Sequence, residues 1–323
     1  MSDDLSRGYE DYVLAMDVGG TTIKTLLLTE TGRILQQRRS PTPDRRDGPE
    51  NAVQVVLDAA TSAIEWGRSG TGHPPRAIAM VTLGLVDEAA GTAVASAALG
   101  WRDVPLRDLL ADRTGLPAVL GQDLRSAARA EAALGVGSTW PSFLFVAIGT
   151  GVGAAIVRDR TVDPGVHGRA GELGHVPVPP GRAGDGHPRA CGCGAHGCLE
   201  TEASATALVR GYRERTGQEV SAAEVARRAL TGDPDAVVVW DDLLDALTFG
   251  LVATTAVLDP GLVVLGGGVA LAGEQLIRPL RARLAERYRL AEPPPMSISP
   301  LGDAAAGLGA GLLGWQHLRD GVR

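Results

Sequence analysis

The sequence predicts an α/β protein built from two lobes, and three observations support this. A chain of 323 residues is too long for one small core and suits two lobes of ordinary domain size. Short apolar runs typical of strands alternate with longer segments typical of helices. Two similar glycine–threonine turns, at residues 17–22 and 149–153, each stand at the start of a set of strands. We therefore expect two copies of one half in a single chain.

The first lobe is predicted to begin with three antiparallel strands from Tyr12. An apolar run, the turn D-V-G-G-T-T, a second apolar run and a T-G turn follow one another there. Residues 40–50 (SPTPDRRDGPE) are rich in proline and charge and predict a loop. The elements expected after this loop are a helix at 51–66, strands at 76–87 and 91–99, a helix at 104–115, a strand at 116–121 and a helix at 124–134.

The second lobe is predicted to repeat the hairpin in S-F-L-F-V-A-I-G-T-G-V-G-A-A-I-V-R-D-R, residues 142–160. Residues 200–258 have the spacing of amphipathic helices. A strand at 262–266 then leads into a glycine cluster and a helix at 271–288. The last segment, at 304–318, is a helix of small residues that can pack closely against a strand or another helix.

Composition and charge favour a globular enzyme of the cytoplasm. Apolar residues make up 44% of the chain, and no apolar run approaches the ~20 residues of a membrane helix. The net charge is −7 and the basic residues are scattered along the chain, which argues against nucleic-acid binding. The first residues, M-S-D-D-L-S-R-G-Y-E-D-Y, are acidic and polar, unlike a signal peptide.

The first glycine–threonine turn is a candidate phosphate-binding site. Its glycines let backbone amides approach a phosphate, with the threonine hydroxyls beside them. Asp17 stands at the strand end, where a carboxylate can order Mg²⁺ or its waters. A bare hairpin turn is the alternative, and Lys24 either approaches the phosphates or, as we favour, faces solvent. The candidate residues are Asp17, Gly19, Gly20, Thr21, Thr22 and Lys24.

Two further glycine clusters are candidate nucleotide contacts. The second turn repeats the pattern of the first between two apolar strands. The third cluster follows a strand and precedes a helix, so its position suits an adenine–ribose site formed by backbone. A tight strand-to-helix turn is the alternative for the third cluster. The candidate residues are Gly149, Thr150, Gly151, Gly153, Gly266, Gly267 and Gly268.

Asp123 is a candidate functional carboxylate. It lies between the strand at 116–121 and the alanine-rich helix at 124–134. A carboxylate at such a junction stands at the edge of a cleft in α/β sheets, where ligands bind. A plain helix N-cap is the alternative, since aspartate is common at that position.

All three cysteines of the chain lie within residues 190–200, A-C-G-C-G-A-H-G-C-L-E. Their odd number and close spacing argue against a disulfide framework, as does a reducing cytosol. The glycines between them let the backbone fold around a metal, and three thiolates need one more ligand to complete a tetrahedral zinc site. Such a site has no spare position, so its zinc is expected to be structural; three unrelated buried cysteines are the alternative. The candidate ligands are Cys191, Cys193 and Cys198, with a fourth from His196, His175, His187 or His167.

Three motifs together resemble the ROK family over nearly the whole chain. D-V-G-G-T-T-I-K resembles its first phosphate motif and A-I-G-T-G-V-G its second. G-E-L-G-H (171–175), followed by C-G-C-G-A-H-G-C-L-E (191–200), is similar to its E-x-G-H and C-x-C-G-x-x-G-C-x-E pair. The resemblance implies the sugar kinase–Hsp70–actin architecture, a two-lobed actin-like ATPase (ribonuclease H-like) fold with a zinc-bound loop. Its lobes would be residues 1–122, completed by the C-terminal helix 303–323, and residues 123–302.

The resemblance also implies roles for individual residues. Structural zinc would be held by the three cysteines and His175. Glu172, His175 and Glu200 would bind sugar hydroxyls. Asp123 would act as general base on the primary hydroxyl of the sugar, which attacks the terminal phosphoryl group of Mg-ATP.

Two residues of the expected sugar side depart from the family pattern. Gln122 stands where the family usually has an asparagine that contacts sugar hydroxyls. The loop that contains Gly84 reads L-G-L-V-D, without the proline of the usual P-G-x-V-D. We expect both positions to contact the substrate, so these differences bear on which sugar is used.

The function implied is that of an ATP-dependent hexose kinase that phosphorylates the 6-hydroxyl of glucose or a close analogue. Gln122 motivates one alternative, a 6-kinase of kanosamine, N-acetylglucosamine or N-acetylmannosamine. A non-catalytic sugar-sensing regulator is a remote alternative, because the family's repressors carry a winged-helix domain and only eleven residues precede Tyr12. The expected partners are a sugar and ATP, with a second copy of the chain in a homodimer and neither nucleic acid nor membrane.

Overall fold

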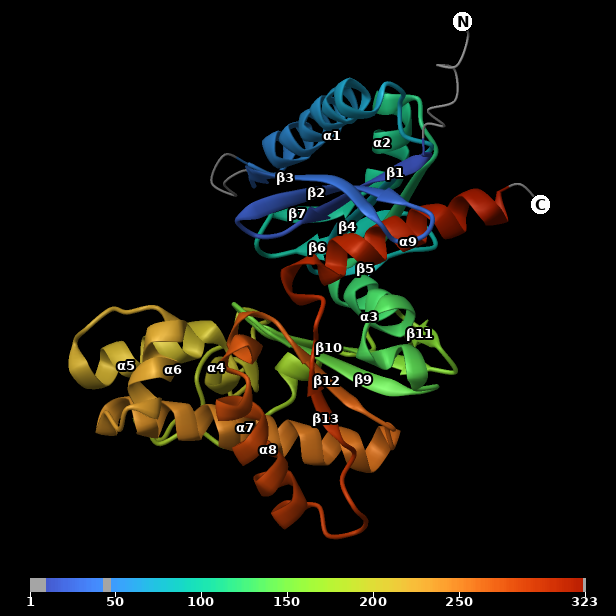
Figure 1. Ribbon diagram of the computed structural model, residues 1–323. Helices are drawn as coiled ribbons and strands as arrows, with labels where there is room; N and C mark the ends of the chain where they lie inside the picture. Colours follow the sequence, from blue (N-terminus) through green and yellow to red (C-terminus); the bar gives the residue numbers. More distant parts are fainter. Residues whose placement is uncertain (1–9, 43–47, 322–323) are drawn as a thin grey trace, which may run out of the picture. The chain divides into compact units, whose positions relative to one another are not determined.

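The computed structural model describes residues 10–42 and 48–321 (Figure 1). The chain forms two compact units, which are described separately. Unit 1 comprises the described residues up to Ala130 and those from Ala304 onward, and unit 2 comprises Glu131–Asp303. The expected division into functional lobes after residue 122 stays a prediction, and the segment M-S-D-D-L-S-R-G-Y lies outside the described residues.

Each unit contains a five-stranded sheet, and both sheets have the same topology. In each, three antiparallel strands come first and two parallel strands extend the sheet beside the first of them. This confirms the predicted α/β class and the repeated half. The strands of unit 1, in the order β3-β2-β1-β4-β8, are β1 (Tyr12–Val18), β2 (Thr22–Thr29), β3 (Ile34–Pro41), β4 (Ile78–Thr82) and β8 (Ala118–Gln122). The strands of unit 2, in the order β11-β10-β9-β12-β13, are β9 (Phe143–Ile148), β10 (Val152–Arg158), β11 (Thr161–Asp163), β12 (Val263–Gly266) and β13 (Met296–Ile298).

Unit 1 also contains a small three-stranded sheet, formed by the part of the sequence that connects β4 to β8. Residues 76–87 form two strands rather than the one predicted, because Gly84 takes a positive φ of 98° and turns the chain. The strands of the small sheet are β5 (Leu85–Asp87), β6 (Thr92–Ser96) and β7 (Trp101–Val104). The helices are α1 (Pro49–Thr71), α2 (Leu106–Thr114), α3 (Asp123–Leu134, which continues into unit 2) and α9 (Ala305–Asp320).

Strand β1 is buried along its whole length because helices cover both faces of the sheet. On one face Tyr12, Leu14 and Met16 pack with apolar residues of α1. On the other face α9 lies against the sheet, as Figure 1 shows. The small residues of α9 permit this contact, since a Cβ at Gly311 would stand only 2.2 Å from Leu28 of β2. The predicted close packing of this helix is confirmed.

Unit 2 packs its helices against one core with β9, β10 and β12. Leu144, Val146 and Ile148 of β9 point into this core together with Leu243 and Leu247. The helices are α4 (Glu200–Ala203), α5 (Ala205–Thr216), α6 (Ala222–Leu230), α7 (Pro234–Leu258) and α8 (Glu274–Arg287). Short 3-10 helices lie at η2 (Val136–Thr139), η3 (Leu173–His175), η4 (Gly268–Ala272) and η5 (Gly302–Ala304).

The helix predicted from residue 271 begins later, at Glu274. Gly273 takes a positive φ of 59°, which ends η4 and starts α8 in a new direction. Within residues 10–42 and 48–321, we find no helix with the length and apolar character needed to cross a bilayer.

Candidate functional site

The parallel strands of unit 1 end at one edge of its sheet, and the predicted site residues of this unit lie there. The backbone register pairs Val18 of β1 with Thr82 of β4, and Thr82 with Gln122 of β8. The first glycine turn, Gly84 and Asp123 follow these strand ends directly in the sequence. Ligands of α/β proteins commonly bind beyond the carboxyl ends of parallel strands. The structure thus brings the first turn and the predicted base to the same edge.

The first turn, residues 19–21, is a tight connection between β1 and β2. The amide of Gly19 donates to the carbonyl of Thr22 at 3.1 Å. Thr42 holds the turn from the side, because its hydroxyl donates to the carbonyl of Gly19 at 2.7 Å and its amide to that of Thr21 at 3.0 Å. Gly20 and Thr21 remain exposed. The turn is therefore fixed by its own chain while its tip is accessible to a ligand.

Asp17 and Lys24 face each other across the same hairpin. They are register partners in β1 and β2, and Lys24 Nζ lies 3.7 Å from Asp17 Oδ2. The side chain of Asp17 is 11% exposed and that of Lys24 is 26% exposed. The ammonium group compensates a largely buried carboxylate, which gives Lys24 a structural role that needs no phosphate. Its contact with a phosphate stays a prediction.

Gly84 occupies a position that only glycine fits. Its φ of 98° is unfavourable for other residues, and a Cβ there would stand 2.3 Å from the carbonyl oxygen of Ala95. The turn after β4 therefore presses against β6. This explains the glycine by backbone packing, and its predicted contact with the substrate is untested.

Asp123 begins α3 directly after the last residue of β8. Its Oδ1 accepts hydrogen bonds from the backbone amide of Leu124 at 2.8 Å and from Nε2 of Gln122 at 2.7 Å. The Oε1 of Gln122 in turn accepts a bond from the backbone amide of Arg125 at 2.8 Å. Both polar atoms of the Gln122 amide are therefore bonded to the first turn of α3.

Three charged residues that sequence analysis missed lie behind this turn. Glu88 Oε1 accepts from the backbone amide of Gln122 at 3.0 Å and from Nε of Arg125 at 2.8 Å, and Glu88 Oε2 accepts from Arg129. Arg125 also donates to the carbonyl of Val86 at 2.8 Å and is only 3% exposed. The small sheet is thereby tied to the N-terminal end of α3.

Glu88 remains ionised in this network. Burial acts to raise the pKa of Glu88, but the guanidinium groups of Arg129 and Arg125 outweigh burial and hold it below its usual value. The sequence contained one signal for this network. Arg125 and Arg129 lie four residues apart in an alanine-rich helix, so both project from one face and can pair with one anion there.

In unit 2, the second and third glycine clusters lie side by side. The parallel strands β9 and β12 pair Ala147 with Gly266. Gly267 takes a φ of 82°, and a Cβ there would stand 2.5 Å from the carbonyl oxygen of Ile148, the residue just before the second turn. The second turn closes through the amide of Gly149, which donates to the carbonyl of Gly151 at 2.9 Å. Both clusters thus meet at the carboxyl ends of these strands.

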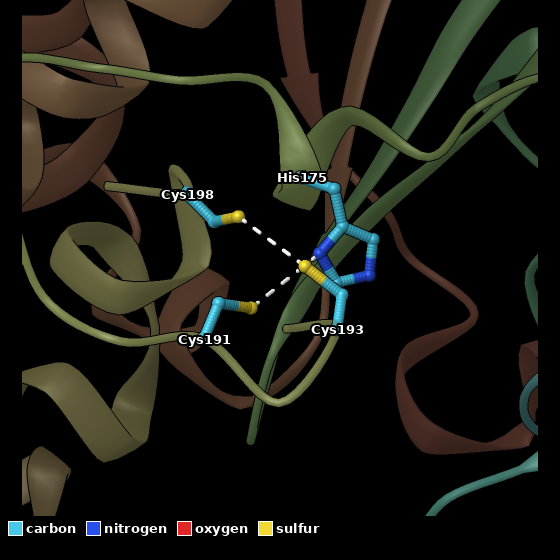
Figure 2. Close-up of side chains that lie close together, drawn as sticks. All are labelled: His175, Cys191, Cys193 and Cys198. Carbon is cyan, nitrogen blue, oxygen red and sulfur yellow. Dashed lines mark hydrogen bonds between the residues drawn. The ribbon is translucent and has the colours of Figure 1, made fainter. Parts of the chain in front are cut away.

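The structure gathers His175, Cys191, Cys193 and Cys198 into one cluster (Figure 2). Their ligand atoms all lie within 4.8 Å of one another. Cys193 Sγ is 3.6 Å from Cys198 Sγ, and Cys191 Sγ is 3.6 Å from Nδ1 of His175. Of the four histidines that the residues alone left open, His175 is the one in this group.

The cluster has the donor set of a tetrahedral zinc site, and two of its atom pairs have the separation that such a site requires. Zinc binds sulfur at about 2.3 Å and imidazole nitrogen at about 2.0–2.1 Å, which places neighbouring ligand atoms of a tetrahedron about 3.5–3.8 Å apart. Both close pairs match this separation. Without a cation, burial raises the pKa of Cys191 to about 12. Burial likewise raises the pKa of Cys198, whereas hydrogen bonds from the backbone amide of Ala195 and from Cys191 lower that of Cys193. A cation between the sulfurs would favour the thiolate form of all three, so the donor set of three sulfurs and one imidazole nitrogen fits zinc.

Three groups suited to sugar hydroxyls lie at this cluster: its own His175, and the neighbouring Glu172 and Glu200. Nδ1 of His175 faces the thiols, while its Nε2 lies 3.8 Å from Oε2 of Glu172 on the far side of the ring. Glu200, at the start of α4, lies beside Cys191, whose thiol donates to Oε1 of Glu200 at 3.2 Å. The side chains of Glu172, His175 and Glu200 are 44%, 38% and 26% exposed. All three predicted sugar-binding residues are thus accessible and mounted on one loop system.

Comparison with known proteins assigns the chain to a family. A model of the ROK family matches residues 13–318, which include both glycine–threonine turns, Asp123 and the whole His/Cys cluster. The chain belongs to the ROK family. Among similar proteins, a glucokinase from Halalkalibacterium halodurans is 33% identical, with 94% of each chain covered. An N-acetylmannosamine kinase from Yersinia pestis is also 33% identical, over 84% of this chain and 87% of the relative.

A solved ROK structure has the same fold over nearly the whole chain. It is a glucokinase from Streptomyces griseus in complex with glucose and AMPPNP, and it is 29% identical with a TM-score of 0.80. The match covers 94% of this chain and 99% of the glucokinase. In the present chain the predicted site residues form two groups, one in each unit. Unit 1 holds the first turn, Gly84, Gln122 and Asp123. Unit 2 holds the other two glycine clusters, the cluster of His175 and the three cysteines, and the predicted sugar-binding residues Glu172 and Glu200.

Proposed function

We propose that this ATP-dependent sugar kinase transfers the terminal phosphoryl group of ATP to the 6-hydroxyl of glucose or a close glucose analogue, with Asp123 as general base. We place it in the actin-like ATPase class on the repeated sheet topology. The observation that carries the proposal is the grouping of Glu172, His175 and Glu200 around a zinc-type cluster. Carboxylates and an imidazole with neighbouring polar atoms suit the adjacent hydroxyls of a hexose.

The cluster would serve the sugar by rigidity. Bound zinc supplies a cross-link between the loop that carries His175 and the loop that carries the cysteines. Hydrogen-bonding groups discriminate well only when they are held within a fraction of an ångström of the productive geometry. Glu172 and His175 belong to one loop and Glu200 follows the cysteines, so one metal would fix all three.

The phosphate side would use backbone rather than side chains. Phosphoryl transfer requires little covalent help from the protein and depends on positioning and charge neutralisation. The exposed tip of the first turn in unit 1 would offer backbone amides to the phosphates. The second and third clusters, which lie side by side in unit 2, would offer theirs to the phosphates and the nucleoside. Mg²⁺ bound with ATP would neutralise phosphate charge near Asp17. Asp123 would accept the proton of the attacking hydroxyl.

An amino sugar is the second candidate substrate. One observation favours it: a relative from Yersinia pestis, 33% identical, is named an N-acetylmannosamine kinase. Kanosamine, N-acetylglucosamine and N-acetylmannosamine remain the candidates in this class.

A coupled ADP-release assay with Mg-ATP against a panel of sugars tests the proposal. The panel contains glucose, kanosamine, glucosamine, N-acetylglucosamine, N-acetylmannosamine, fructose and allose. We expect glucose to give the highest kcat/KM, and Asp123→Asn to lower kcat by about 10²–10⁴. A clear preference for an amino sugar would move the substrate to the second candidate. No turnover with any sugar of the panel would contradict the proposed kinase function and favour a non-catalytic sugar-sensing protein.

The remaining expectations concern assembly and location. A homodimer and a cytoplasmic location stay predictions. Analytical ultracentrifugation at micromolar concentration checks the first, since a dimer has twice the mass of the 323-residue chain.

We also propose that sugar binding draws the two lobes together and excludes water from the transferred phosphoryl group.

A further inference from the structure

The side chain of Gln122 uses both ends of its amide within the protein. Oε1 faces the backbone amide of Arg125, which can only donate, so the orientation of the amide is determined. Nε2 must therefore point to Oδ1 of Asp123, at 2.7 Å. The bond from the amide of Arg125, the third residue of α3, to Oε1 is the bond that an N-cap side chain accepts. The bond from Nε2 to Asp123, the first residue of α3, is made in addition.

We propose that Gln122 is a positioning residue that orients the carboxylate of Asp123, and that it acts through Asp123 rather than as a ligand of the sugar. The inference rests on the proposed function, in which Asp123 is the general base. Two donors, Nε2 of Gln122 and the amide of Leu124, converge on the same oxygen of Asp123. Together they restrict rotation of the carboxylate about the Cβ–Cγ bond of Asp123. The direction of Oδ2, its second oxygen, is thereby fixed.

Gln122 can act in this way because it is itself held on several sides. It is 8% exposed, and its backbone lies in β8 in register with Thr82 of β4. Its amide donates to Glu88, and Arg125 donates to the same carboxylate oxygen. Glu88, Gln122 and Arg125 thus form a closed ring of hydrogen bonds, since the Arg125 amide returns to Gln122. Because the pKa of Glu88 lies below its usual value, its carboxylate is ionised at neutral pH and can accept both hydrogen bonds of the ring.

The ring predicts a specific kinetic signature. A hydrogen bond donated to a carboxylate favours its charged form, so loss of the Gln122 donor raises the pKa of Asp123. Gln122→Leu removes both bonds of the amide, whereas Gln122→Glu keeps an acceptor for Arg125 but turns a carboxylate toward Asp123. In both variants the acid limb of the kcat–pH profile is expected to move to higher pH, and further in Gln122→Glu.

The experiment compares kcat, sugar KM and the kcat–pH profile for wild type, Gln122→Leu, Gln122→Glu and a surface control, with Mg-ATP and the preferred sugar. The control is Gln54→Leu, which removes an exposed bond from Gln54 to Asp58 on α1. We expect kcat to fall about 10- to 100-fold in both Gln122 variants, as for hydrogen bonds to charged groups. Sugar KM is expected to change less than about threefold, and the control to match wild type. Gln122→Glu preserves the helix cap, so it reports even where Gln122→Leu folds poorly.

One outcome overturns the inference alone. A raised sugar KM with an unshifted acid limb, while Asp123→Asn is inactive, would make Gln122 a sugar ligand and leave the kinase mechanism standing. A second outcome removes the mechanism beneath it, since near-normal kcat in Asp123→Asn would show that Asp123 is not the base. A shifted acid limb with unchanged KM supports the inference, and so does an unchanged order of sugar preference in Gln122→Asn.

Discussion

The substitution Gly309→Ala tests whether the packing of the last helix controls the position of the proposed base. Gly309 lies in α9, and a Cβ there would stand 1.7 Å from the carbonyl oxygen of Ser126 in α3. Real Cβ atoms keep at least 3.0 Å from such neighbours, so about 1.3 Å of movement is required. The obstacle is backbone and cannot rotate away. Ser126 is three residues from Asp123 on the same helix, so any movement of α3 reaches the carboxylate.

Two opposing terms decide the sign of the effect on stability. Alanine in place of glycine stabilises a helix interior by about 1 kcal/mol through its lower backbone entropy when unfolded. Forcing extra volume into a well-packed contact costs about 1–3 kcal/mol, and more where backbone must move. At Gly309 the second term wins, because no flexible side chain can yield. We expect a net loss of about 2 kcal/mol in the free energy of unfolding.

Gly70 provides the matched control. It also lies in a helix, α1, but it is exposed, and the atoms nearest to a new Cβ belong to the flexible amide of Gln36. Gly70→Ala is expected to be neutral or stabilising by up to about 1 kcal/mol, with full kcat. Urea denaturation followed by circular dichroism gives the stabilities, and the ADP-release assay gives kcat, which we expect to fall about tenfold or more in Gly309→Ala. Wild-type stability and kcat in Gly309→Ala would refute the reasoning.

Three further predictions concern charge, metal and the sugar-binding loop. Glu88→Gln leaves the guanidinium of Arg125 buried without its anion and should cost about 3 kcal/mol. The pKa of Glu88 is lowered in the folded protein from its usual 4.5, so the carboxylate contributes its full stability above that value. The difference in unfolding free energy between wild type and Glu88→Gln should therefore be constant from about pH 8 to 5 and become smaller below about 4.5. Urea titrations at several pH values measure this difference. Cys193→Ser should weaken sugar binding more than AMPPNP binding in calorimetry; unchanged sugar affinity in a folded, zinc-free protein would contradict this. Gly151→Ala places a Cβ 2.5 Å from Oε2 of Glu200, so sugar KM should rise about tenfold, and an unchanged KM would exclude Glu200 from the sugar site.

Local patterns in the sequence predicted the elements that local physics controls. The two glycine–threonine hairpins and the buried strands around them were found because turn residues and apolar runs are short-range signals. β7 was missed because its sequence, W-R-D-V, has no long apolar run, and it is defined by pairing with β6. β13 was missed for the same reason, since three residues become a strand only beside β12.

The fourth ligand of the metal cluster could not be chosen from spacing, because a non-local pairing decides it. The segment after His175 pairs with the segment before α4: the amide of Leu199 donates to the carbonyl of Val176, and the amide of Val178 to that of Gly197. Pro177 and Cys198 form a bridge between these segments. His175 is thereby carried to the cysteines, although His196 is much nearer in sequence.

The direction of the Gln122 side chain was equally beyond local patterns. Its residue type suggested a longer reach toward a substrate, but the structure turns the amide back onto its own helix. That choice depends on Glu88, which lies far away in sequence and holds the backbone of Gln122 and the side chain of Arg125 together. A family motif identifies the position, whereas its hydrogen bonds depend on residues outside the motif.

The metal cluster and the second glycine turn are parts of one packed assembly in unit 2, and this bears on what zinc would do. A Cβ at Gly174, next to His175, would stand 2.0 Å from the carbonyl oxygen of Val152, so the histidine loop lies directly on β10. Glu200 lies between the two sides, because its Oε1 is 3.2 Å from Sγ of Cys191 while its Oε2 lies against Gly151. A shift of the cysteine loop therefore moves a sugar-type carboxylate and a glycine of the proposed phosphate turn together. Zinc at this position would fix the cysteine loop beside the proposed sugar-binding groups and the proposed phosphate turn, so its loss should weaken sugar binding first and reach the nucleotide through Glu200.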